Sequence, residues 1–228
     1  MGTSNTCRKG INMSDPFLPI ECLGIVAFAI SGAMLAIRKG MDLFGVNIMG
    51  LTTAVGGGCL RDVLLGIDPP QMLRDPTFAL IAIVTSTVFF AIVYFNRSIP
   101  SEKMKARYQL VLLYCDAVGL GVFTAIGVET ALRLYPNGTL FLLLFVALLT
   151  GTGGGILRDV LAGETPSVLV RHVYAVASLL GAGAYILLRD VLPPNLATGC
   201  SALVTVVIRG LASHYRWNFP RITQAPPA

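Results

Sequence analysis

The chain has 228 residues, of which 54% are hydrophobic and 13% charged, and its formal net charge at pH 7 is +5. Soluble globular proteins have about a quarter of their residues charged, so this composition excludes an ordinary soluble domain. The basic residues stand at the ends of apolar blocks and form no stripe interleaved with aromatic residues, so nucleic acid is not expected as a partner. Membrane lipids are the expected partners instead.

The apolar residues gather into long blocks, and about 20 apolar residues in a helix cross a hydrocarbon core of roughly 30 Å. Turn-forming residues separate the blocks, as at Pro69-Pro70 and Pro193-Pro194. We expect an all-α membrane protein with seven transmembrane helices, at about 20–37, 43–65, 78–95, 110–128, 139–161, 172–188 and 196–212. The seventh is the weakest candidate, because it is short and rich in Thr and Ser.

The domain organisation follows from these blocks. Residues 18–212 are expected to form a single transmembrane domain, between a disordered N-terminal tail (1–17) and a C-terminal tail (213–228). Of the 17 Lys and Arg residues, six lie on the N-terminal side of the expected spans and eleven on the opposite side. Because cytoplasmic loops carry the excess of basic residues, this distribution predicts the N-terminus outside and the C-terminus in the cytoplasm.

An eleven-residue segment occurs twice, as GGGCLRDVLLG at 56–66 and GGGILRDVLAG at 153–163, with nine identical positions at an offset of 97. At an offset of 95, Glu21 corresponds to Asp116. The first three spans (about 18–95) therefore correspond to the next three (about 110–188), and the seventh helix stands outside the repeat. Because three is odd, the second copy enters the membrane from the opposite side, which gives two inverted three-helix repeats.

The repeated segment begins with three glycines in each copy. Glycine in a helix interior costs about 1 kcal/mol relative to alanine, so two such runs indicate a compensating role. One interpretation is a kink that frees backbone carbonyls to replace water around a cation. The other is close helix packing, since small residues let backbones approach. The candidate pore and kink positions are Gly56, Gly57, Gly58, Gly153, Gly154 and Gly155.

An Arg-Asp pair follows each glycine run, Arg61-Asp62 and Arg158-Asp159. Neighbours at i and i+1 do not face each other on a helix, so we expect neither pair to neutralise itself. Ionised groups at membrane depth must be paired or hydrated. Two arrangements stay open: pairs between the repeats that lock the halves together, or side chains that line hydrated vestibules and act as a gate.

Three further polar residues are candidates for lining a path. Asp116 lies deeper in its span than Glu21, which makes a cation-attracting role more plausible for it; the alternative is an acid that favours the positive end of a helix dipole. Ser31 and Thr124 supply hydroxyls near the glycine runs. They either line a path or bond back to helix carbonyls.

The paired GGGxLRDVLxG segments in a seven-span chain with three-plus-three repeats resemble the prokaryotic trimeric intracellular cation (TRIC) channel family. Some members of that family were earlier described as uncharacterised membrane proteins or glycine transporters. The resemblance implies a homotrimer in a prokaryotic inner membrane, with a pore for monovalent cations in each protomer, K⁺ above all and Na⁺ as well. It also implies that the second and fifth helices are kinked at the six glycines.

The sequence carries no nucleophile–base pair, metal-ligand cluster or cofactor loop, so we expect a non-enzyme with no catalytic residue and no cofactor or metal beyond permeating K⁺ or Na⁺. A secondary transporter of a small zwitterion such as glycine is the alternative, since inverted repeats and broken helices suit it equally.

Overall fold

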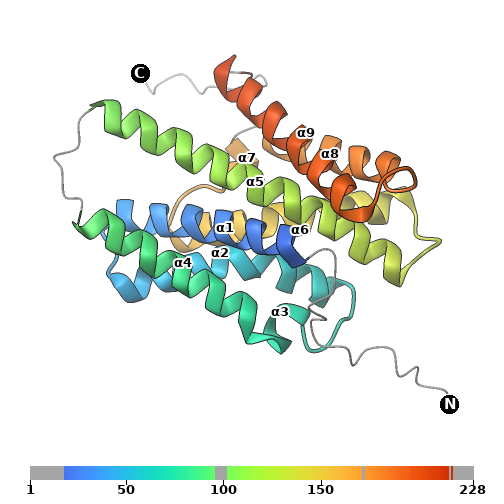
Figure 1. Cartoon of the computed structure of the whole chain (residues 1–228), viewed down its shortest axis with the longest axis horizontal. Coiled ribbons are helices and arrows are strands. Elements are labelled where there is room, and N and C mark those ends of the chain that lie inside the picture. The colour runs from blue at the N-terminus through green and yellow to red at the C-terminus, as the bar shows by residue number, and fades with distance from the viewer. Residues whose placement is uncertain (1–17, 96–101, 171–172, 216, 218–228) are drawn as a thin grey trace, which may run out of the picture.

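The computed structural model describes residues 18–95, 102–170, 173–215 and 217, and within these ranges the chain is helical, with no strand. The expected N-terminal tail and most of the expected C-terminal tail lie outside the described residues. The helices are α1 (Leu18–Arg38), α2 (Leu43–Leu64), α3 (Gln71–Arg74), α4 (Pro76–Phe95), α5 (Glu102–Leu134), α6 (Leu140–Leu161), α7 (Ser167–Val170), α8 (Val173–Leu188) and α9 (Pro194–His214). The long helices lie side by side in a bundle (Figure 1).

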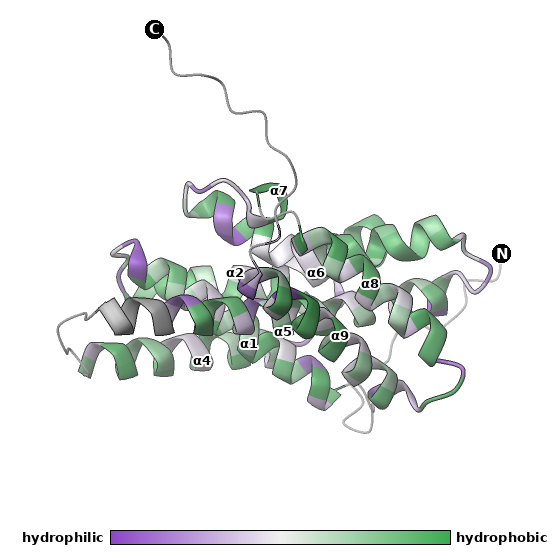
Figure 2. Cartoon of the chain, turned by 90° about the horizontal axis from the view of Figure 1, so that it is seen from above, coloured by the Kyte–Doolittle hydropathy of each residue, from purple (hydrophilic) through white to green (hydrophobic). Residues whose placement is uncertain are grey.

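Six of these helices, α1, α2, α4, α5, α6 and α9, are long and apolar enough to cross a membrane. The all-helical, membrane-spanning fold class is thereby confirmed. α8 is apolar but shorter, and its 16 residues extend for about 24 Å at 1.5 Å per residue. The expectation that the seventh helix would be the weakest was wrong, because α9 has 21 residues. Hydrophobic residues cover much of the length of the long helices (Figure 2).

The second helix of each half begins and ends with the same local chemistry. The Asp42 carboxylate accepts a hydrogen bond from the Gly45 amide (2.8 Å) and so caps α2. At the start of α6, the Thr139 hydroxyl accepts one from the Leu142 amide (3.3 Å). Both helices stop just before a glycine in the left-handed region, which only glycine adopts without strain, at φ 71° and 67° in positions 66 and 163.

The bundle is built from two similar groups of helices joined through four of them. α1 and α2 pack on each other and on α4, while α5 and α6 pack on each other and on α8. α1 meets α5 and α2 meets α6, so these four helices enclose the centre of the molecule. α9 packs mainly on α5 and α8 of the second half and touches α1 of the first half more lightly. α4 is the most exposed candidate span, with 17% of its apolar window buried.

Candidate functional site: a helix crossing and a buried charge cluster

α2 and α6 cross at their glycine runs. A Cβ added to Gly57 would lie 2.3 Å from the carbonyl oxygen of Thr150, and one added to Gly154 would lie 2.0 Å from that of Thr53. Real Cβ atoms do not come so close to backbone, so only glycine permits this approach. Both helices continue through the runs, and close packing of α2 on α6 is the role observed there. A kink remains a prediction.

The remaining glycines of the runs also face neighbouring groups. A Cβ on Gly56 would lie 2.5 Å from Leu157 Cδ1, and one on Gly153 would lie 3.0 Å from Leu60 Cδ1. These two contacts are equivalent at the offset of 97. Gly58 faces Met72 of α3 and Gly155 faces the hydroxyl of Tyr174 on α8. The three glycines of each run therefore each lie against a different neighbouring group, on successive faces of the helix.

The arginine after each glycine run pairs with its own neighbour. Arg61 Nε and Nη2 lie 2.8 and 2.7 Å from Asp62 Oδ1, and Arg158 Nε and Nη2 lie 2.9 and 2.8 Å from Asp159 Oδ1. The expectation that these pairs could not neutralise themselves was wrong. The i, i+1 rule describes the average directions in which neighbouring side chains leave a helix, whereas here the long arginine chain folds back over the next residue. All four side chains are buried, so an unpaired charge would be costly.

The second oxygen of each aspartate fixes the segment that follows its helix. Asp62 Oδ2 accepts a hydrogen bond from the Gln71 amide at 2.7 Å, and Asp159 Oδ2 accepts one from the Ser167 amide at 2.7 Å. Gln71 and Ser167 are the first residues of α3 and α7. The carboxylates therefore hold these short helices at the ends of α2 and α6.

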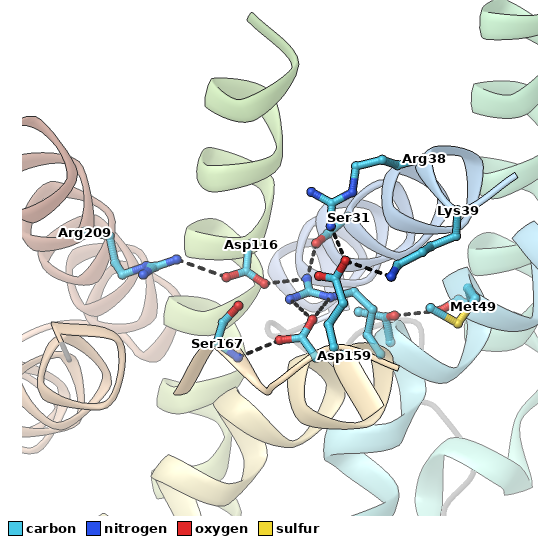
Figure 3. A network of polar contacts seen from close by, with 11 residues as sticks. Ser31, Arg38, Lys39, Met49, Asp116, Asp159, Ser167 and Arg209 are labelled. Atoms are coloured by element: carbon cyan, nitrogen blue, oxygen red, sulfur yellow. Dashed lines mark hydrogen bonds and ion pairs between the residues drawn. The ribbon is translucent and has the colours of Figure 1, made fainter. Parts of the chain in front are cut away.

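In the second half the pair extends into a cluster of buried charges (Figure 3). Arg158 Nη1 donates to Asp116 Oδ1 at 2.7 Å and also to the Ser31 hydroxyl of α1. Arg209 Nη2 of α9 lies 3.2 Å from Asp116 Oδ2. Four of the predicted site residues, Ser31, Asp116, Arg158 and Asp159, thus meet at one place, and Ser31 brings the first half into it.

A small cavity adjoins this cluster. It has a volume of about 30 Å³, enough for about two water molecules, and its lining includes both charged and apolar side chains. The lining residues are Leu35, Arg38, Leu112, Leu113, Asp116, Arg158, Asp159 and Ser167. The cavity is therefore a polar chamber beside the ends of α1 and α6.

Arg38 is held beside this chamber by a carboxylate from the other half. Arg38 Nη2 lies 2.6 Å from Glu164 Oε1, and Lys39 Nζ lies 3.1 Å from the same oxygen. Burial would raise the pKa of the Glu164 carboxyl, but the hydrogen bonds and charges of Lys39 and Arg38 outweigh it and hold the pKa below its usual value of 4.5. Glu164 is therefore ionised at neutral pH and connects the α1–α2 turn to the α6–α7 turn.

Two of the predicted site features lie elsewhere. Thr124 exchanges a hydrogen bond with Ser178 of α8 at 2.7 Å and lies against Gly151 of α6. Arg61 and Asp62 form their own pair in the first half, against α3. Neither joins the charge cluster around Asp116.

Three residues of the site, Arg209, Glu164 and Tyr174, were not predicted from the sequence. Arg209 was counted among the basic residues at the ends of spans, but its side chain is only 5% exposed and its guanidinium carbon lies 4.3 Å from the centre of the Tyr174 ring. A signal was present, since Ser201, Thr205 and Arg209 recur every four residues and so lie on one face of α9.

The match to a known protein family falls into two segments, one in each half of the chain. A family model described as "Glycine transporter" matches residues 18–94 and 113–190. A UPF0126 membrane protein of Deinococcus radiodurans is 39% identical over 219 residues, which cover 94% of this chain and 93% of that protein. The UPF0126 inner membrane protein YadS of Escherichia coli K12 is 38% identical over 205 residues, which cover 88% and 93%.

Solved structures of TRIC channels resemble this fold. A TRIC trimeric intracellular cation channel orthologue from Rhodobacter sphaeroides matches with a TM-score of 0.76 and 32% identity, over 88% of this chain and 98% of that one. A prokaryotic TRIC channel in 0.5 M KCl matches with a TM-score of 0.78 and 32% identity, over 89% and 98%. The chain belongs to the TRIC channel family. The segments matched by the family model leave α9, with Arg209, outside them.

Proposed function

We propose that this TRIC family member is a monovalent cation channel that conducts mainly K⁺, and also Na⁺, through one pore in each protomer of a homotrimer. The observation that carries the proposal is the match to a TRIC channel structure over 89% of the chain at 32% identity. A buried carboxylate beside a polar chamber adds to it, because acidic groups at membrane depth attract cations. Passive conduction has no chemical step and uses no cofactor.

The proposed pore runs along the crossing of α2 and α6. The contacts there are reciprocal: Gly57 approaches Thr150 as Gly154 approaches Thr53, and each pair of equivalent positions is 97 residues apart. Reciprocal contacts of this kind support two inverted repeats related by an axis in the membrane plane, with the crossing near the midplane. In the arrangement described here the glycines are packed together, so conduction requires α2 and α6 to bend or separate at them. Glycines are among the places where helices bend.

The proposed setting is a prokaryotic inner membrane, with the N-terminus outside and the C-terminus in the cytoplasm. The excess of basic residues on the side of Arg38 and Arg158 supports this orientation. The chamber beside Asp116 then opens toward the cytoplasm. Lipid contacts fall on the exposed apolar faces, and α4 is the least buried of the candidate spans.

Glycine transport is the second candidate, and the description of the matching family model favours it. A secondary transporter would use the same inverted repeats, with substrate bound near the midplane and released alternately to each side. The two candidates differ in a measurable way. A channel carries many ions in each opening, whereas the uptake rate of a transporter saturates as the substrate concentration rises.

Purified protein reconstituted in planar bilayers tests both candidates. Unitary currents that reverse near the K⁺ equilibrium potential under K⁺ and Cl⁻ gradients are expected, with smaller Na⁺ currents. Saturable glycine uptake into vesicles without unitary currents would overturn the channel and support the transporter. Gly57→Leu should abolish the currents, whereas Gly183→Ala, at a helix position with nothing within 4 Å of an added Cβ, serves as the matched control. Light scattering of the detergent-solubilised protein measures whether it is trimeric.

A further inference from the structure

Asp116 has both carboxylate oxygens occupied by arginines. Arg158 Nη1 lies 2.7 Å from Oδ1 and Arg209 Nη2 lies 3.2 Å from Oδ2. The residue lines the chamber next to Arg38 and is 4% exposed. As arranged, neither oxygen is free to coordinate an entering cation.

The two arginines are not held equally. Arg158 is anchored by Asp159 and Ser31 in addition to Asp116. Arg209 has one contact to Asp116, which is also the longer of the two, and a face-on contact with the Tyr174 ring at 4.3 Å. Among the described residues its Nε, although buried, has no hydrogen-bond partner. Arg209 is therefore the partner that Asp116 can lose at least cost, and its contact with the face of the Tyr174 ring stabilises its charge independently of Asp116.

The charges of the cluster balance only while Arg209 is counted. Asp116 and Asp159 contribute two negative charges, and Arg158 and Arg209 two positive ones. Without Arg209 the cluster carries one net negative charge beside the chamber. In the first half, Arg61–Asp62 is equivalent to Arg158–Asp159 and Glu21 is equivalent to Asp116, but the repeat supplies no equivalent of Arg209, which comes from α9.

We propose that Arg209 is a tethered internal cation that competes with permeant K⁺ for Asp116, so that α9 sets the cation affinity of the chamber. This rests on the proposed channel function. Arg209 in place lowers the affinity of the chamber for K⁺, and its withdrawal toward Tyr174 exposes Oδ2 and raises that affinity. Because the second half alone carries α9, the effect acts on K⁺ that enters from the chamber side.

Single-channel recording of full-length variants tests this inference. Arg209→Gln should lower the K⁺ concentration that gives half-maximal conductance from the chamber side by about fivefold, the ratio that corresponds to about 1 kcal/mol for unit charges 4 Å apart in water. The half-saturating concentration from the opposite side should change less. Asp116→Asn should raise the chamber-side value and move the reversal potential toward that of Cl⁻, because the cluster then carries one net positive charge. Arg209→Lys, which keeps the charge, should shift the value less than Arg209→Gln.

Arg189→Gln is the matched control, since Arg189 forms a partly exposed pair with Asp190 at 3.4 Å at the far end of α8. Arg209→Met is a second neutral variant, whose sulfur can still contact the Tyr174 ring. Equal effects of Arg209→Gln and Arg189→Gln, or equal effects from both sides, would overturn the inference while wild-type K⁺ currents leave the channel function standing. Loss of folding in both neutral variants would also overturn it, because Arg209 would then only hold the helices together. Absence of currents in the wild type would instead defeat the channel function and this inference with it.

Discussion

Phe28 of α1 and Phe123 of α5 stack with their ring centroids 5.4 Å apart and their planes 12° from parallel. Both side chains are fully buried, and the two residues are equivalent at the offset of 95. Each ring covers a glycine on the other helix: a Cβ on Gly119 would lie 2.2 Å from the Phe28 ring, and one on Gly24 would lie 3.1 Å from the Phe123 ring. Equivalent residues that touch each other lie close to the proposed axis, so this pair joins the two halves at their centre.

Truncation of either ring should destabilise the protein strongly. We expect Phe28→Ala and Phe123→Ala each to lower the free energy of unfolding by about 3–5 kcal/mol, because each leaves a cavity between α1 and α5. The double variant should lose less than the sum, by about 0.5–1.5 kcal/mol, because the stacking energy is removed only once. Unfolding in mixed detergent micelles measures these values. Phe44→Ala is the control, since Phe44 is 73% exposed, and a coupling to Phe28 as large as that of Phe123 would contradict the prediction.

The glycine crossing should tolerate no added methyl group. Gly57→Ala and Gly154→Ala would each place Cβ against a backbone carbonyl that cannot move without shifting its helix, and we expect a loss of about 1–3 kcal/mol of stability for each. Gly183→Ala and Gly199→Ala have open space and should be neutral or stabilising by up to about 1 kcal/mol. Thermal unfolding of the four variants in one detergent compares them.

An equal response of all four glycine variants would show that helix propensity, and not the approach of α2 to α6, governs these positions. The single changes also separate packing from conduction. A variant that keeps wild-type stability but loses current would locate the function of the run in its bending.

The spans and the second-helix ends could be predicted because local rules determine them. Long apolar blocks must be helical in a membrane, and glycine must follow α2 and α6 where the chain takes a positive φ. The Arg–Asp pairing could not be predicted from the sequence, because a rule for the average direction of neighbouring side chains does not cover an arginine that folds back on a buried partner. Pairing within one turn depends on burial, which only packing against the other helices creates.

The cluster around Asp116 depends on contacts that no local pattern contains. Ser31, Asp116, Arg158 and Arg209 come from four different helices, and their meeting follows from how these helices pack. The repeat predicted equivalence of the halves, but α9 has no counterpart in it and supplies Arg209, for which the first half has no equivalent. The sequence did place Asp116 and Arg158 among the candidates, because each is an ionisable residue within a span.

Removal of one aspartate from an Arg–Asp pair should leave a costly buried charge. Asp62→Asn removes the partner of Arg61, whose side chain is 2% exposed, and also weakens the hydrogen bond from the Gln71 amide. We expect a loss of about 3–5 kcal/mol of stability, as for other broken buried pairs. Asp190→Asn removes an exposed partner of Arg189 and should cost at most about 1 kcal/mol. Similar melting temperatures for the two variants would show that water reaches Arg61.

The bridge from Glu164 to Arg38 and Lys39 should make stability depend on pH in one direction. The pKa of Glu164 is lowered in the folded protein below its usual 4.5, because the gain from the two bases exceeds the effect of burial. A lowered folded-state pKa contributes stability above the unfolded-state pKa, and this contribution is lost as the pH falls through the folded-state value. The wild type should therefore melt at a higher temperature than Glu164→Gln. This difference in melting temperature should be largest near neutral pH and should shrink below about pH 4.5. The difference will be small, since these side chains are about one-third exposed or more. Melting curves of both proteins across this pH range measure the difference, and Asp190→Asn is the control for the loss of a negative charge. A difference that is constant with pH would show that Glu164 does not act as an ionised bridge between the two halves.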